Sequence, residues 1–316
     1  MSGSTTTRPT RRSPAATAEP RSRSSRGSGS SRVGAGLAGV LLVGFAVFFA
    51  LPLLWLLLAV TKSGGALIRR SPFAVGSWHD LSANWHQLMA FQDHAVGRWV
   101  ANSAEYSLAA LVLTLLISIP AGYALALTSF RGRKTLLAIT LVVMLMPNTA
   151  LVLPVFLEMN KVGLVGNALS VILPFSFYPF GVYLAYIYFS SSIPGSLLEA
   201  ARLDGCSELA VFVRIALPLA APIVALVGFF SFVQNWNNYF LPFVMLPSSN
   251  QYPVQVGLST LLSSTPAFNP SSAGSDPVQL PTLALATVVS VLPVLLVFLF
   301  SQRFLVSGMT AGGTKE

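Results

Sequence analysis

The sequence has few charged residues and almost no cysteine. Only 9% of its 316 residues are Asp, Glu, Lys or Arg, whereas a soluble domain carries about a quarter. Cys206 is the single cysteine, so no internal disulfide can form. No stretch matches the glycine-rich phosphate-binding loop that ends in lysine and serine or threonine. We therefore expect no ATP site of that kind on this chain.

Ionisable residues are also scarce inside the apolar stretches. Glu105 is the only carboxylate within the spans predicted below, and it lies close to the external end of its span. An ion-coupled carrier or a proton pump buries such residues in its membrane spans. We therefore expect the energy for any transport to come from another subunit.

What the sequence has instead is long uncharged runs. Each exceeds the roughly 20 residues that cross a bilayer core as a helix, and together they predict an all-α membrane protein with six transmembrane helices. The uncharged runs cover residues 33–61, 106–130, 135–157, 162–198, 215–275 and 277–302. Within a transmembrane domain at 34–316, we predict spans at about 34–61, 101–127, 135–157, 167–190, 219–246 and 281–303.

The first 33 residues form a basic tail. Seven of the 19 basic residues are arginines in the first 32 positions, within a Ser-, Thr-, Pro- and Gly-rich tract. Such a composition cannot bury a core, so we expect disorder. Next to a membrane helix, the tail indicates a topology determinant that also touches anionic membrane lipid, and no nucleic acid is expected as a partner.

The basic residues are distributed unequally between the two sides of the predicted bundle. Six spans place both termini on one side, and that side then holds 14 basic residues against five on the other. The five are Lys62, Arg69, Arg70, Arg98 and Lys161. Because positive charge is enriched on the cytoplasmic side, we expect both termini in the cytoplasm.

Two short patterns do not fit the sites that they suggest. A GxGxxG pattern at Gly34, Gly36 and Gly39 follows the basic tail rather than a strand, so it favours close helix packing over dinucleotide binding. Three histidines are spaced seven and eight residues apart in the first external loop, without a carboxylate cluster, and favour loop polarity over metal binding. They are His79, His86 and His94.

One charged segment interrupts the apolar sequence. Residues 199–222 read EAARLDGCSELAVFVRIALPLAAP, with five charged residues within 16 positions. Ser196 and Glu199 have the spacing of a capping box, which predicts a helix start. Gly205 suits the left-handed residue that ends a helix, and Ser207 can open a second helix that runs to Pro218. We predict a helix–glycine–helix element at the cytoplasmic surface.

A face of small residues is predicted on this element. Ala200, Ala201 and Gly205 would permit close approach by another protein.

The same segment resembles a known family. EAARLDG, followed by nine residues and IALP, is similar to the EAA motif of ABC importer permeases. Further stretches resemble the maltose-type carbohydrate-uptake permeases, and the ending resembles their second inner-membrane subunit. These stretches are Asn102–Ser103, MLMP at 144–147, WNNYFLP at 236–242 and the final GMTAGGTKE.

The resemblance implies a type I ABC importer fold and a set of partners. These are a second, similar permease, a dimer of ATPase subunits that carry ATP and Mg, and an extracellular or periplasmic sugar-binding protein in a bacterial cell membrane. No cofactor is implied on this chain. Residues 196–215 would dock on the ATPase, with Glu199 pairing with a basic residue there. The implied coupling residues are Glu199, Ala200, Ala201, Arg202, Asp204, Gly205 and Pro218.

A polar and aromatic cluster offers candidates for the solute pathway. Trp236, Asn237, Asn238 and Tyr239 combine rings that stack on sugar faces with amides that match hydroxyls. The alternative is that the two aromatic residues serve helix packing or an interfacial belt.

Three other functions remain to be weighed against a sugar permease. One is a permease of the same superfamily for a solute such as glycerol phosphate. Another is an intramembrane enzyme, which would need catalytic carboxylates, a Ser/His pair or a zinc cluster at the membrane surface. A channel would not account for the helix–glycine–helix segment.

Overall fold

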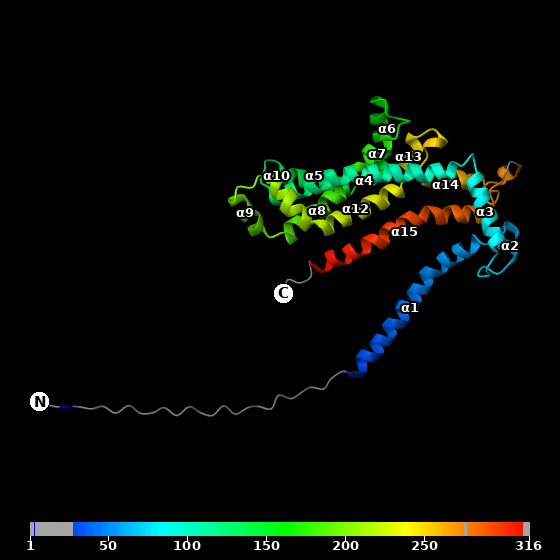
Figure 1. Ribbon diagram of the computed structural model, residues 1–316, viewed down its shortest axis with the longest axis horizontal. Helices are drawn as coiled ribbons and strands as arrows, with labels where there is room; N and C mark the ends of the chain where they lie inside the picture. The colour runs from blue at the N-terminus through cyan, green and yellow to red at the C-terminus, as the bar shows by residue number, and fades with distance from the viewer. Residues whose placement is uncertain (1–2, 4–27, 275–276, 312–316) are drawn as a thin grey trace. The chain divides into compact units, whose positions relative to one another are not determined.

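Every regular element that the structure describes is a helix (Figure 1). The computed structural model describes residues 3, 28–274 and 277–311, so most of the predicted tail and the last five residues lie outside it. Two compact units divide the chain, at 1–52 and 53–316. The first contains most of α1 (Ser28–Ala59), an apolar helix with Pro52 inside it.

The second unit holds the remaining helices. Most of its apolar segments of membrane-spanning length are formed by α4 (Ala95–Leu127), α5 (Arg133–Met144), α6 (Val152–Lys161), α7 (Leu169–Ser176), α8 (Pro179–Ser192), α12 (Ala221–Trp236) and α15 (Leu280–Ala311). Its other elements are α2 (Gly64–Arg69), α3 (Trp78–Ala90), η1 (Asn148–Leu151), α9 (Gly195–Leu203), α10 (Glu208–Val211), the π-helical η2 (Phe212–Ala216), α11 (Leu217–Leu219), α13 (Phe240–Met245), η3 (Ser249–Gln251), α14 (Val254–Ser263) and η4 (Pro270–Gly274).

Within residues 28–274 and 277–311, four segments are long and apolar enough to cross a membrane alone, and two bent helix pairs raise the number to as many as six. The four are Gly34–Ala59, Ala95–Leu127, Leu169–Ser192 and Leu280–Arg303. The pairs are Arg133–Met144 with Asn148–Lys161, bent by 101°, and Glu208–Leu219 with Ala221–Trp236, bent by 77°.

The first bent pair replaces the single span that the sequence predicts at 135–157. The chain leaves the helix at Leu145 and Met146, whose amides bond three residues back, and Pro147 is extended with ψ 129°. Proline lacks the amide hydrogen that would continue the helix and disfavours helical backbone at the residue before it. The break leaves Asn148 and Thr149 at a corner between two helices.

The second difference concerns the span predicted at 219–246. Its helix α12 ends at Trp236, and α13 begins again at Phe240. The Asn238 side chain accepts a hydrogen bond from the Leu241 amide at 3.4 Å, so it offers the start of α13 a local partner. The predicted single span is therefore a helix, a polar turn and a short second helix.

Helix α4 lies at the centre of the second unit and packs against α7, α8 and α12. Small residues permit this: a methyl group on Gly122 would overlap Ala185 of α8. Three apolar clusters follow the length of α4. They centre on Trp99 and Trp236, on Tyr106 and Phe175, and on Tyr123 and Phe189.

Candidate functional site

The charged segment forms the predicted helix–glycine–helix element, at the end of the bundle where α9 and α10 lie beside the ends of α4 and α8 (Figure 1). Helix α9 begins at Gly195 with Pro194 as its N-cap and no side-chain cap. The predicted capping box is therefore wrong: Ser196 already lies in the first turn, because proline before it fixes the extended backbone from which the helix starts.

Gly205 ends α9 as predicted. Its φ is +83°, the left-handed conformation that glycine adopts without strain. The Gly205 amide donates to the Arg202 carbonyl at 3.1 Å and the Cys206 amide donates to the Ala201 carbonyl at 3.0 Å. This pair of bonds is the Schellman motif. The Ser207 hydroxyl then accepts from the Ala210 amide at 3.3 Å and caps α10.

The face that α9 exposes differs from the predicted small-residue face. Ala201 is 8% exposed and packs with Leu198 in the cluster around Tyr123 and Phe189. Ala200 and Gly205 remain exposed. Ala201 points inward because it follows buried Leu198 by three residues, on the same side of the helix.

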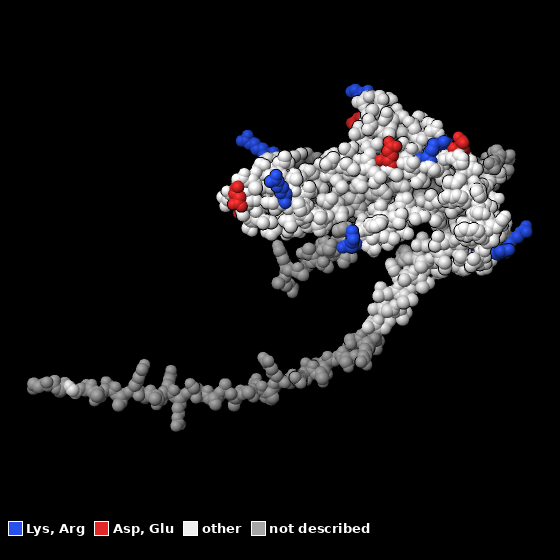
Figure 2. All heavy atoms as spheres, in the orientation of Figure 1, with Lys and Arg blue, Asp and Glu red and all other residues white. Residues whose placement is uncertain are grey.

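Apolar residues that the sequence reading missed flank the glycine bend. Leu203 is 89% exposed and Leu209 is 72% exposed, on either side of Gly205. Acidic and basic side chains are visible at the same end of the bundle (Figure 2), so these leucines lie on a surface that is partly apolar and partly charged. Glu199 and Asp204 lie exposed on the same segment, and Pro218 is exposed in α11.

Arg202 and Glu208 form an ion pair across the bend. The Arg202 Nε lies 2.7 Å from Glu208 Oε1, and Nη2 lies 3.3 Å from Oε2. The hydrogen bond to Glu208 raises the pKa of Arg202. The sequence reading named Arg202 as a coupling residue but did not anticipate this partner.

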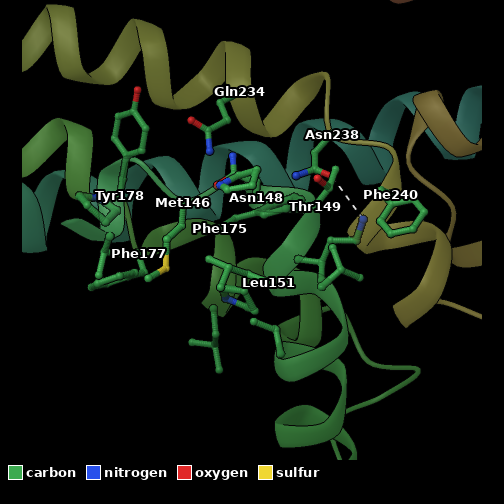
Figure 3. Close-up of a pocket in the computed structure, with 18 of the residues that line it drawn as sticks. Met146, Asn148, Thr149, Leu151, Phe175, Phe177, Tyr178, Gln234, Asn238 and Phe240 are labelled. Atoms are coloured by element: carbon green, nitrogen blue, oxygen red, sulfur yellow. Dashed lines mark hydrogen bonds between the residues drawn. The ribbon is translucent and has the colours of Figure 1, made fainter. Parts of the chain in front are cut away.

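A cavity of about 610 Å³ lies elsewhere in the second unit, among α5, η1, α6, α7, α8, α12 and α13 (Figure 3). Its polar side chains come from distant segments: Asn148 and Thr149 at the corner after Pro147, Gln234 of α12 and Asn238 of the following turn. Its aromatic side chains are Phe175, Phe177, Tyr178, Phe180 and Phe240.

The cavity is almost without charge. Glu158 is the single ionisable acid among its lining residues, and these include no Lys, Arg or His. Uncharged amides supply paired donors and acceptors, and aromatic rings supply flat apolar faces. Such a lining suits a neutral solute with many hydroxyl groups.

Of the four predicted pathway residues, the structure brings only Asn238 to this cavity. Trp236 is 2% exposed, and its Nε1 donates to the Ser290 carbonyl at 2.9 Å. Asn237 donates to the Val233 carbonyl and accepts from Gln255. The Tyr239 ring stacks on Phe243 at 5.3 Å.

The sequence gave only a weak indication of the other polar residues that line the cavity. Gln234, Asn148 and Thr149 are polar residues within uncharged, otherwise apolar runs. Nothing in the sequence shows that a break at Pro147 brings two of them opposite the third. For metal ions, residues 28–274 and 277–311 contain no group of three or more His, Cys, Asp or Glu that could hold one.

Comparison with known proteins places the chain. It is 33% identical over 282 residues to the arabinooligosaccharides transport system permease protein AraQ of Halalkalibacterium halodurans, covering 88% of this chain and 97% of the relative. It is 28% identical to the diacetylchitobiose uptake system permease protein NgcG of Streptomyces coelicolor, covering 90% of each chain.

A solved structure is also similar. A chain in the crystal structure of a bacterial ABC transporter that imports the acidic polysaccharide alginate matches with a TM-score of 0.75 and 27% identity, covering 87% of this chain and 98% of that one. Residues 118–311 match the family described as binding-protein-dependent transport system inner membrane component. With this match across more than half of its length, the chain belongs to that family.

Proposed function

We propose that this chain is one of two paired permease subunits of an ATP-driven importer for neutral oligosaccharides. The observation that carries the proposal is the exposed helix–glycine–helix element at the end of an apolar bundle. The chain has no phosphate-binding loop sequence of its own, and this element offers a surface on which an ATPase can dock. The sugar is supported by the relatives, whose names include arabinooligosaccharides, diacetylchitobiose and lactose.

Coupling runs through residues 196–215. Leu203 and Leu209 are exposed and supply apolar contact area. Glu199 is exposed and forms no ion pair within the described residues, so it is available to a basic residue of the ATPase. Closure of the ATPase dimer on ATP and Mg then moves α9 and, with it, the spans.

The cavity supplies this chain's half of the solute pathway. Asn148, Gln234 and Asn238 offer amides to sugar hydroxyls, and the aromatic lining offers faces for stacking. The runner-up solute, glycerol phosphate, would require a cation to balance its phosphate. The lining offers none, which favours the neutral sugar.

The partners and the orientation belong to the same proposal. A second permease completes the pathway, an ATPase dimer binds the cytoplasmic element and an extracellular or periplasmic sugar-binding protein delivers the solute. The chain is a multi-pass protein of a bacterial cell membrane with both termini in the cytoplasm. The 14-to-5 distribution of basic residues supports this orientation.

Reconstitution with the co-encoded permease, ATPase and binding protein tests the function. We expect sugar-stimulated ATP hydrolysis and uptake of labelled oligosaccharide by the complete set, and neither by this chain alone. Gln234→Ala and Asn238→Ala should each lower uptake, since a lost hydrogen bond costs about 1 kcal/mol, or about fivefold. Uptake of glycerol phosphate but of no neutral sugar would overturn the substrate proposal.

A further inference from the structure

The Arg202–Glu208 ion pair spans the glycine bend of the helix–glycine–helix element. Arg202 lies in the last turn of α9, Glu208 is the first residue of α10 and Gly205 lies between them. The two contacts, of 2.7 and 3.3 Å, join a fork of guanidinium nitrogens to both carboxylate oxygens. Two-point contact of this kind fixes the orientation of both side chains as well as their distance.

Tyr123 of α4 packs against the segments that carry this pair. Its ring contacts Phe212, with centroids 4.9 Å apart, and Phe189 of α8 at 5.5 Å. Its hydroxyl is buried and has no hydrogen-bond partner within the described residues. Phe212 follows Glu208 by one helical turn, so the segments that carry the ion pair pack against a side chain of the central membrane helix.

The buried side of α9 packs into the same apolar cluster as Tyr123. Leu198 and Ala201 are the buried residues of α9, and both belong to the cluster that contains Tyr123 and Phe189. Just beyond the end of the helix, Gly205 has no atom within 4 Å of the position that a Cβ would take, apart from those of its chain neighbours. No side chain therefore packs on the bend at that point, and the ion pair is a polar link that crosses it.

We propose that the Arg202–Glu208 pair, together with the packing of Phe212 on Tyr123, positions α9 on the cytoplasmic end of α4. A push on α9 then moves α4 and α8 instead of flexing the chain at Gly205. Both members of the ion pair are positioning residues, and their role is distinct from docking, which falls to Glu199 and the exposed leucines. The inference rests on the proposed coupling to an ATPase.

The test compares Arg202→Gln, Glu208→Gln and the charge-swapped Arg202→Glu/Glu208→Arg in the complete reconstituted importer. We expect each single variant to keep the ATPase bound and to lower sugar uptake per ATP hydrolysed about two- to fivefold, the effect of one partly exposed ion pair. The swapped pair should recover at least half of the lost coupling. Unchanged coupling in the single variants, or no recovery in the swapped pair, would overturn the proposal.

A second measurement on the chain alone separates this inference from the proposed function. Cys206 is exposed and is the only cysteine, so a nitroxide spin label attached there reports motion of the bend. We expect its mobility to rise in both single variants, to return in the swapped pair and to stay unchanged in Glu199→Gln, the matched control on α9. Equal mobility in all variants would overturn the positioning role, whereas loss of sugar-stimulated hydrolysis in the unaltered complex would overturn the proposed function instead.

Discussion

The indole ring of Trp99 lies directly against the backbone of Gly257. A methyl group on Gly257 would overlap the ring, which is fully buried and donates its N–H to the Ser249 carbonyl at 2.9 Å. Through this contact, α14 packs close to the first turns of α4. The contact also fixes η3, because the same indole holds its backbone.

Gly257→Ala should therefore destabilise the protein. Overpacking of a filled site costs about 1–3 kcal/mol, and thermal unfolding of the detergent-solubilised chain measures the loss. Gly228→Ala in α12 is the matched control, since its new methyl would lie 3.6 Å from Leu111, an ordinary contact. We expect the control to keep or raise the melting temperature, because alanine favours a helix over glycine. Equal melting temperatures for the two variants would contradict the tight packing.

Trp236 is expected to stabilise the bundle rather than to select the solute. Its N–H donates to the Ser290 carbonyl, and its ring stacks on Phe232 at 5.6 Å. Trp236→Phe should lower the free energy of unfolding by about 1–3 kcal/mol, because it removes the hydrogen bond to the Ser290 carbonyl and part of a buried ring. The half-saturating sugar concentration of the reconstituted importer should stay the same. A changed sugar preference with unchanged stability would instead indicate that Trp236 contacts the solute.

Lys62 holds the chain after α1 in place. Its side chain is fully buried, and Nζ donates to the carbonyls of Ser71 and Pro72 at 3.0 and 2.8 Å. Lys62→Met would leave both carbonyls without this charged donor, at a cost of about 1.5–3 kcal/mol. We expect a lower melting temperature and faster proteolysis at 71–77. Lys161→Met, on an exposed lysine, is the control and should change neither.

Local features could be predicted from the sequence better than contacts between distant segments. Gly205 and Ser207 act within a few residues of themselves, so their roles at the two helix ends could be predicted from the residue type. Ser196 could not, because Pro194 had already fixed where α9 begins. The cavity escaped prediction, since Asn148, Gln234 and Asn238 meet only after the chain breaks at Pro147.

Side-chain partners escaped prediction for a related reason. The Arg202–Glu208 pair depends on how sharply the chain turns at Gly205, and the packing on Tyr123 depends on how α4 lies there. The spacing of charged residues in the sequence predicts neither the ion pair nor the packing on Tyr123. Hydropathy predicted the apolar segments, but two of the predicted spans are interrupted, one at Pro147 and the other between Trp236 and Phe240.

Cysteine labelling tests the proposed orientation. Cys206 is exposed, and we expect an impermeant maleimide to modify it only from the cytoplasmic side. In a Cys206→Ser background, Asn250→Cys should be modified only from the outside. Asn250 is exposed and its carbonyl, rather than its side chain, bonds to Asn102, so the substitution leaves the local structure intact. Modification of both sites from the same side would contradict the predicted six-span topology.

Substitutions at Gly205 should follow the cost of left-handed backbone. With φ at +83°, valine is strained because its branched Cβ crowds the following carbonyl, whereas asparagine tolerates the conformation. We expect coupled sugar uptake to fall in the order Gly, Asn, Ala, Val, with about 1–2 kcal/mol lost at the bend for alanine and more for valine. Gly195→Ala is the control: it lies in the first turn of the same helix, with ordinary φ and open space around its Cα. Membrane yield should be equal throughout the series, and co-purification of the ATPase should fall with uptake. Full uptake in Gly205→Val would show that the left-handed bend is not needed for coupling.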